Sequence, residues 1–200
     1  SDHVASAAAV TVQTPGGTGA LRVAGDFLRK IGQRSIYVSK PTWANHRSVF
    51  TAAGMEVGEY SYLDANGRWL NFPAMIEDLE NLPHGSVVLL HACCHNPSGA
   101  DPTTEQWQQI ADTLAHKRHL PLVDFAYQGF GEGLTEDATG LRALAERCPE
   151  MLICSSYSKN FGLYCERVGG LTLIAKDSLA AQHSLSQAKL CVRANYSNPP

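Results

Sequence analysis

The chain has 200 residues, 44% of them hydrophobic, and a formal net charge of -3. It is long enough to bury a core, and it lacks the basic excess that binding to nucleic acid or an anionic membrane requires. No apolar run approaches the ~20 residues that cross a bilayer, and no signal-peptide pattern opens the chain. Six cysteines outside disulfide-framework spacings indicate a reducing compartment, so we expect a soluble cytoplasmic protein.

Short β-branched strands alternate with amphipathic helices along the chain. An alanine-rich run comes first, with no recognisable strand, and glycines lead into the first helix. Strands are predicted over 35–39, 55–60, 86–91, 120–125, 151–155 and 168–174, and helices over 18–30, 104–117 and 178–191. The alternation predicts one α/β domain, with a mostly parallel sheet covered by helices on both faces. The turn over 198–200 and the alanine-rich start make both ends look cut.

The first chemically informative stretch is TPGGTGALR, over 14–22. Gly16 and Gly17 lead into a helix, so free backbone N–H groups and the Thr18 hydroxyl can converge on an anion. The stretch is not a Walker loop, because no Gly-Lys-Ser/Thr follows. The dinucleotide fingerprint also fails, in its spacing and in the strand it needs beforehand. A phosphate site is therefore indicated only if other donors join it.

The turn HACCHNPSGADP, over 91–102, follows a predicted strand. Its two histidines and two cysteines are metal-ligand types, but the cysteines are adjacent and no second pair lies at finger-like spacing, so no metal site is predicted. Asn96 is held extended by Pro97, which suits an amide aimed at a ligand oxygen. The alternative is a turn asparagine that bonds only its own backbone.

Asp124 lies at the end of the strand over 120–125, among apolar and aromatic neighbours in VDFAYQGF. Burying a carboxylate there is costly unless a cation or a donor compensates. Ligands of open α/β sheets bind beyond the carboxyl ends of the strands. Asp124 is therefore either the counter-ion of a buried cation or a helix N-cap.

Lys159 stands in SSYSKNFGLYCERVGG, among small and hydroxylated residues. Ser156 and Ser158 add hydroxyl groups, and Arg167 adds a permanent cation suited to a phosphate or carboxylate. A desolvated lysine beside positive charge loses its proton, and the neutral amine attacks aldehydes. The alternatives are a surface lysine and an arginine paired with Glu166.

A phosphate cup, an aldehyde-capturing lysine, a carboxylate for a pyridine nitrogen and a donor for a phenolic oxygen serve one cofactor together. That cofactor is pyridoxal phosphate. The segments that carry these parts, with PTWANH and RANYSNPP, resemble class I (fold type I) aminotransferases, above all the aspartate and aromatic amino-acid aminotransferases. The resemblance runs in order from about residue 11 to residue 200, and it implies a mostly parallel mixed sheet sandwiched by helices.

The resemblance implies a role for each matching residue. Lys159 binds the cofactor covalently and then shuttles the proton between the substrate Cα and the cofactor C4′. Asp124 pairs with the ring nitrogen, with His46 behind it, while Tyr127 and Asn96 hold the O3′ oxygen. Lys159, Asp124 and Tyr127 are thus the implied catalytic residues.

The remaining implied contacts involve the ring face, the phosphate and the substrate. Trp43 stacks on the ring. Without the resemblance, Trp43 would be interpreted as a core residue and His46 as a helix-capping residue. The residues implied at the phosphate are Gly16, Gly17, Thr18, Ser156 and Arg167. The residues implied at the substrate are Arg193, Trp43 and Asn96. Arg193, which alone reads as a helix C-terminal cation, reaches the partner subunit's site in this family, so a homodimer is implied.

Family members are about twice as long, so we expect residues 1–200 to be the cofactor-binding large domain, without an N-terminal arm or a C-terminal small domain. The implied reaction exchanges an amino group between an amino acid, aspartate or glutamate first, and a 2-oxo acid. One alternative is an aromatic amino-acid aminotransferase or another enzyme of this fold, such as a β-lyase. Another is a binding module without catalysis, since the arginine that clamps the α-carboxylate in this family has no match here.

Overall fold

The computed structural model describes residues 2–197 and has one seven-stranded sheet, in the order β1-β7-β6-β5-β4-β2-β3. The strands are β1 (Ala9–Pro15), β2 (Ser35–Lys40), β3 (Glu56–Ser61), β4 (Val87–His91), β5 (Leu120–Phe125), β6 (Met151–Ser156) and β7 (Val168–Ile174). The helices are α1 (Asp2–Ala5), α2 (Gly16–Lys30), α3 (Asn45–Ala52), α4 (Phe72–Asn81), α5 (Thr104–His116), the 3₁₀ turn η1 (Glu136–Ala138), α6 (Thr139–Arg147) and α7 (Ser178–Asn195). Neighbouring strands from β3 to β6 pair in parallel, and β7 runs antiparallel to both β6 and β1. The predicted α/β class and mostly parallel sheet are confirmed.

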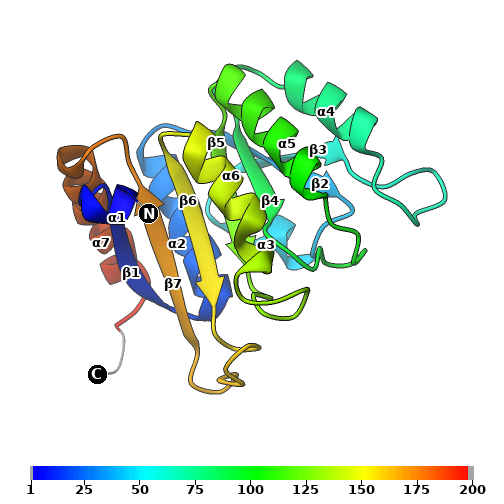
Figure 1. Cartoon of the computed structure of the whole chain (residues 1–200). Helices are drawn as coiled ribbons and strands as arrows, with labels where there is room; N and C mark the ends of the chain where they lie inside the picture. Colours follow the sequence, from blue (N-terminus) through cyan, green and yellow to red (C-terminus); the bar gives the residue numbers. More distant parts are fainter. Residues whose placement is uncertain (1, 198–200) are drawn as a thin grey trace.

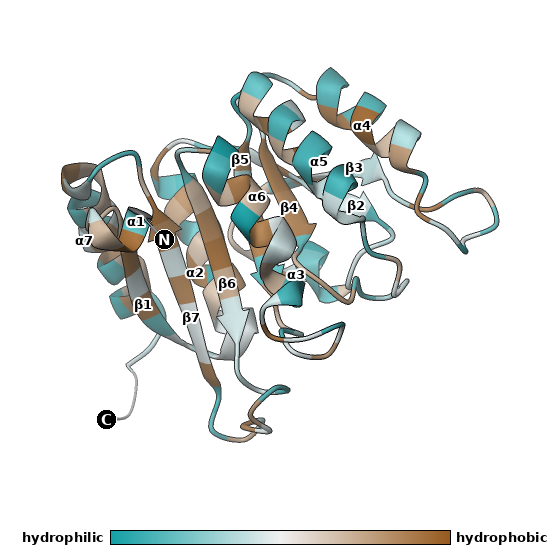
Figure 2. Cartoon of the chain, in the orientation of Figure 1, coloured by the Kyte–Doolittle hydropathy of each residue, from teal (hydrophilic) through white to brown (hydrophobic). Residues whose placement is uncertain are grey.

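Helices cover both faces of the sheet (Figure 1). Helices α2, α3 and α7 pack together on one face, and α4, α5 and α6 pack on the other. In β4, Val87 and Leu89 join the hydrophobic cluster under α2, while Val88 and Leu90 join the cluster under α5. Because the strand is buried on both faces, its sequence is a continuous apolar run, and β4 and β6 stand out as brown arrows in Figure 2.

Strand β1 corrects one sequence-based interpretation, because it leads directly into the glycine stretch that was thought to lack a preceding strand. Val12 is buried while Thr11 and Gln13 are exposed, as expected of an edge strand with one covered face. This alternation is short and follows an alanine-rich run, which hid it. Helices α3, α4 and α6 were not predicted either, and α2 begins two residues earlier than expected.

The strand directions bring several strand ends to one edge of the sheet. Two successive antiparallel pairings, β6 with β7 and β7 with β1, give β1 the same direction as β6. Pro15 pairs with Val168, and Ser156 pairs with Gly169, so the start of α2, the end of β6 and the start of β7 lie at one level. No helix among residues 2–197 is long and apolar enough to span a membrane.

Candidate active site

A cavity of about 360 Å³ opens at the carboxyl ends of the parallel strands. This is where ligands bind in open α/β sheets. Its walls come from the start of α2, the segment before α3, the ends of β4, β5 and β6, and the loop between β6 and β7. The lining residues that the sequence predicted are Gly17, Thr18, Trp43, Asn96, Asp124, Tyr127, Ser156, Lys159 and Arg167.

Asp124 lies inside β5, near the carboxyl end of the strand, and it lines the cavity. A position within a strand rules out the helix N-cap alternative. Nε2 of His46, from the first turn of α3, lies 2.9 Å from Oδ2 of Asp124, and the His46 side chain is fully buried. The carboxylate therefore has a buried hydrogen-bond donor behind it, and His46 does not cap its helix.

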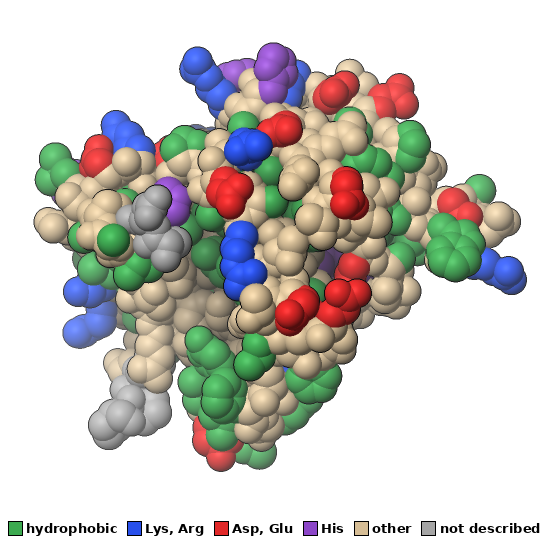
Figure 3. Space-filling model, viewed as in Figure 1, with side chains coloured by type: hydrophobic (Ala, Val, Ile, Leu, Met, Phe, Trp, Pro, Cys, Tyr) green, Lys and Arg blue, Asp and Glu red, His purple; other side chains and the backbone are tan. Residues whose placement is uncertain are grey.

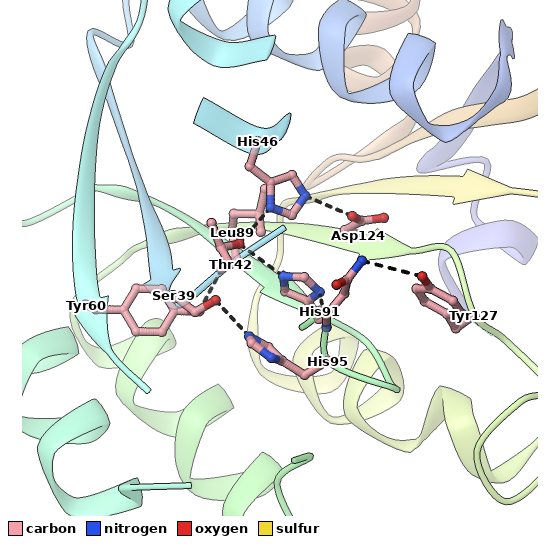
Figure 4. A network of polar contacts seen from close by, with 10 residues as sticks. Ser39, Thr42, His46, Tyr60, Leu89, His91, His95, Asp124 and Tyr127 are labelled. Carbon is pink, nitrogen blue, oxygen red and sulfur yellow. Dashed lines mark hydrogen bonds and ion pairs between the residues drawn. The ribbon is translucent and has the colours of Figure 1, made fainter. Parts of the chain in front are cut away.

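A chain of hydrogen bonds leads from Asp124 to the turn that carries Asn96 (Figure 4). The Asn96 backbone N–H donates to Nδ1 of His91 over 3.4 Å, and burial lowers the pKa of His91 to about 3. His91 is therefore neutral and carries its proton on Nε2, 3.2 Å from Oγ1 of Thr42. The Thr42 hydroxyl proton is then free for Nδ1 of His46, 2.7 Å away, which leaves the His46 Nε2–H to donate to Asp124.

Tyr127 and Lys159 meet on the opposite side of the cavity. The Nζ atom of Lys159 lies 4.2 Å from the centroid of the Tyr127 ring, and no salt bridge holds Lys159 within the described part of the chain. The side-chain amide of Asn96 donates to the Tyr127 hydroxyl over 3.5 Å. The Asn96 side chain thus bonds another residue, so it is not a turn asparagine that bonds only its own backbone. The Lys159 amine faces the cavity and has no carboxylate partner within residues 2–197.

Arg167 and the first turn of α2 form the side of the cavity with positive potential. Arg167 donates to Oγ of Ser158 and to the Tyr164 carbonyl oxygen, at 3.2 and 2.9 Å. Among residues 2–197 it has no carboxylate partner, so the proposed pairing with Glu166 is wrong. The α2 N-terminus has no side-chain cap, which leaves its N–H groups free for an anion.

Gly16 and Gly17 leave little space for a side chain on this side. A Cβ on Gly16 would lie 2.5 Å from Nη2 of Arg167, and one on Gly17 would lie 2.9 Å from Cβ of Ser156. Gly16 also has a φ of 73°, which favours glycine. A side chain on Gly16 would occupy the space beside the guanidinium group, and one on Gly17 would crowd Ser156.

Four of the implied site residues differ in their position relative to the cavity, namely Trp43, Gly16, His46 and Arg193. Trp43 lines it and packs edge-on against the His46 ring, with 5.2 Å between centroids. Gly16 and His46 lie directly behind lining residues. Arg193 is exposed in the last turn of α7 and does not line the cavity, so its predicted role in a partner's site stays a prediction.

The sequence reasoning weighed His91 only as a metal-ligand type and did not single out Tyr164, although both line the cavity. His91 is the last residue of β4, so the rule that sites lie at strand ends could have found it. Tyr164 belongs to an irregular loop, and no pattern in the sequence marks it. Within residues 2–197, no cluster of three or more histidine, cysteine or acidic residues could hold a metal.

The loop after Tyr127 is anchored by one buried carboxylate. Asp137, in η1, accepts four backbone N–H groups at 2.7–3.4 Å. The donors are Gly129, Gly131, Glu132 and Gly133. Burial alone would raise the pKa of Asp137, but the four donors together outweigh it and hold the pKa below its usual value.

We expect Asp137→Asn to destabilise the chain by about 2–3 kcal/mol at neutral pH, since charge-assisted bonds are replaced and an NH₂ group faces N–H donors. A depressed pKa stabilises the fold above the unfolded-state value of about 3.9, and this contribution is lost as the pH falls through the folded-state pKa. Urea unfolding at neutral pH and near pH 3 should therefore show a smaller difference in acid. Asp112→Asn, at an exposed ion pair, is the control. Equal unfolding free energies for the two variants at neutral pH would contradict this.

Residues 1–199 match the family model for aminotransferase class I and II. The chain is 58% identical over 191 residues to the aspartate aminotransferase of Escherichia coli strain K12, covering 95% of this chain and 48% of that protein. It is 49% identical to the aromatic-amino-acid aminotransferase of Pseudomonas aeruginosa, covering 94% of this chain and 47% of that protein. The chain thus spans about half the length of the curated relatives it matches.

Solved structures give the same result. The aromatic-amino-acid aminotransferase of Burkholderia pseudomallei, covalently bound to pyridoxal phosphate, has a TM-score of 0.96 and 44% identity, covering 100% of this chain and 50% of that one. A mitochondrial aspartate aminotransferase of Trypanosoma brucei has a TM-score of 0.96 and 41% identity, covering 100% of this chain and 53% of that one. By sequence and by fold, the chain belongs to the aminotransferase class I and II family.

Proposed function

We propose that the chain is the pyridoxal-phosphate-binding large domain of an aminotransferase, which exchanges an amino group between an amino acid and a 2-oxo acid. The observation that carries the proposal is the position of Lys159. Its amine faces a cavity that also holds a buried carboxylate on one wall and, on another, the Arg167 guanidinium group, which has no carboxylate partner among residues 2–197. The relatives named as aspartate and aromatic aminotransferases support the same reaction.

The residues of the cavity fit pyridoxal phosphate. The volume suits a small cofactor, and two sources of positive potential, Arg167 and the α2 N-terminus, lie close together, since a Cβ on Gly16 would meet the guanidinium group. Asp124 supplies the negative charge at the other end. The Burkholderia pseudomallei relative, whose structure holds this cofactor covalently, supports the assignment.

Pyridoxal phosphate supplies an aldehyde that captures amines and a protonated ring that accepts electrons. Asp124 would hold the proton on the ring nitrogen by charge, and the His46 Nε2–H keeps that carboxylate oriented. Tyr127 and Asn96 would hold the phenolic oxygen, and Trp43 would cover one face of the ring. Ser156, Thr18 and the Gly16–Gly17 backbone would bind the phosphate together with Arg167.

Lys159 would have two tasks. Its Nζ is the amine that takes the aldehyde, and once free it is the base that carries the proton from the substrate α-carbon. The Tyr127 ring beneath it limits where Nζ can go. A base held in place next to its proton gains rate through proximity.

We further propose aspartate or glutamate as the preferred amino acid. The 58% identity to an aspartate aminotransferase and the cationic Arg193, which could bind a side-chain carboxylate in a partner's site, support this choice. The alternative is an aromatic amino acid, because a relative with 49% identity is named as an aromatic-amino-acid aminotransferase.

A homodimer is supported by exposed apolar side chains near the cavity mouth. Figure 3 shows hydrophobic side chains gathered over the loop between β6 and β7. The exposed large hydrophobic residues of this loop and of the loop after Tyr127 are Phe130, Leu134, Phe161, Tyr157 and Tyr164. We propose that a second copy covers these residues and that Arg193 of one chain then reaches the other's site. A monomeric mass in sedimentation at every concentration would contradict this.

The six unpaired cysteines support a cytoplasmic location.

The reaction is tested by adding pyridoxal phosphate to the purified chain, followed by aspartate or phenylalanine. We expect the cofactor's absorption to convert to that of pyridoxamine phosphate, faster with aspartate. Faster conversion with phenylalanine would favour the aromatic alternative. Bound cofactor that neither amino acid converts would support the cofactor site and contradict catalysis by these 200 residues alone.

A further inference from the structure

His95 is a buried histidine next to Asn96 that no step above uses. Its ring lies between two serine hydroxyls, with Nδ1 at 2.7 Å from Oγ of Ser98 and Nε2 at 2.9 Å from Oγ of Ser39. Only 2% of the residue is exposed. Figure 4 shows the ring between β2 and the turn that bears Asn96.

The direction of these hydrogen bonds follows from a carbonyl group at one end. Tyr60 donates its hydroxyl proton to the Leu89 carbonyl oxygen, 2.8 Å away, so its oxygen can only accept the hydrogen bond from Ser39. Ser39 has then used its proton and must accept from the His95 Nε2–H. A neutral His95 has a bare Nδ1, which accepts from the Ser98 hydroxyl.

The His95 ring is neutral because its surroundings disfavour charge. Burial, followed by the proximity of His46, lowers the pKa of His95 to about 4. The Tyr62 ring stacks on it, with centroids 3.9 Å apart and an interplanar angle of 12°. Tyr62 also donates to the Ala100 carbonyl oxygen over 2.7 Å, which ties the far side of the same turn.

Asn96 itself is held loosely by comparison. Its backbone bond to His91 measures 3.4 Å and its side-chain bond to Tyr127 measures 3.5 Å, both at the long limit. Both are longer than the side-chain bonds of His95, whose backbone N–H also donates to Oδ1 of Asp101 over 2.8 Å. The position of the Asn96 amide is therefore inherited from its neighbour.

We propose that His95 is a positioning residue, held in its Nε2–H form between Ser39 and Ser98, which fixes the turn so that the Asn96 amide faces the cavity. The effect on cofactor binding rests on the proposed function, whereas the tautomer and the order of the turn do not. The residue acts through Asn96 and does not itself line the cavity.

The chain contains a matched control in His119. It is also buried, its Nδ1 accepts from Ser86 N–H at 3.1 Å, and its Nε2 lies 3.0 Å from the Leu79 carbonyl oxygen. It precedes β5, at the opposite end of the strand from the cavity. His95→Phe and His119→Phe each remove two buried hydrogen bonds and keep an aromatic ring, so a purely structural role predicts the same result for both.

The first measurement uses the cofactor-free wild-type chain. Nitrogen NMR should find the His95 ring protonated on Nε2 alone and not titrating between about pH 5 and pH 8. Hydrogen exchange of the Asn96 N–H should be faster in His95→Phe than in His119→Phe. A His95 ring that titrates in that range or carries its proton on Nδ1, or equal exchange in the two variants, would overturn the proposal.

The second measurement is the dissociation constant for pyridoxal phosphate. We expect a loss of about tenfold in affinity for His95→Phe, less than twofold for His119→Phe, and partial recovery in His95→Gln, whose amide can donate to Ser39. Equal affinities in folded His95→Phe and His119→Phe would also overturn it. If the wild type binds no cofactor, the proposed function fails, and the NMR and exchange results still decide the role of His95. If His95→Phe does not fold, the wild-type ring nitrogens and His95→Gln decide it.

Discussion

Replacing Lys159 with alanine should abolish covalent attachment of pyridoxal phosphate. Lys159 is the lysine that lines the cavity, and its Nζ lies against the Tyr127 ring. No other lysine of residues 2–197 lines the cavity, so without that amine borohydride should fix no cofactor beyond background. The phosphate and ring contacts remain, so weak, reversible binding should persist. Absorption spectra before and after borohydride reduction, with dialysis, measure both quantities.

The control is Lys176→Ala, which removes an exposed lysine just after β7, at the other end of that strand from Arg167. We expect this variant to bind and retain the cofactor like the wild type. Retention of reduced cofactor by Lys159→Ala at the wild-type level would mean that another amine is the nucleophile, and the assignment would be wrong.

Replacing Asp124 with asparagine should weaken cofactor binding more than any other change that keeps Lys159. A buried charge that loses its partner costs about 3 kcal/mol or more, so affinity should fall by more than about a hundredfold. The buried carboxylate accepts a hydrogen bond from the His46 Nε2–H. An asparagine amide can place either its oxygen or its NH₂ group next to that donor, so the variant also loses a fixed orientation. The dissociation constant from an absorption titration measures the loss.

A graded series separates charge from geometry. His46→Phe keeps the Asp124 charge but removes its donor, so we expect a loss of about tenfold, between wild type and Asp124→Asn. Asp112→Asn changes the same charge at an exposed ion pair and should bind normally. If Asp124→Asn binds as tightly as Asp112→Asn, the carboxylate is not the counter-ion of a bound cation.

The sequence predicted the central strands well because their burial is continuous. β4 and β5 are apolar except for His91 and Asp124 near their carboxyl ends, and the strand boundaries agree to within one residue. β1 escaped because an edge strand shows only alternation, over too few residues to stand out after the alanine-rich run. Short helices such as α3, with eight residues, have too few turns for a clear period.

For the candidate site, residue chemistry predicted the parts, and topology was needed to join them. Nothing local places Gly16 beside Arg167, since the approach depends on the β1-β7-β6 register. The hydrogen bonds that link His91 and His46 to Asp124, and those that hold His95 between two serines, could not be predicted, because each depends on where a proton lies in the folded protein. Arg193 illustrates the remaining limit, because a role in a partner's site leaves no mark on a single chain.

The most direct test of the central claim is a peptide map of the wild-type chain after pyridoxal phosphate has been added and reduced with borohydride. We predict one phosphopyridoxyl group per chain, carried by the peptide that contains Lys159. Cofactor spread over several lysines, or located on one that does not line the cavity, would contradict the claim that this cavity is an aminotransferase active site.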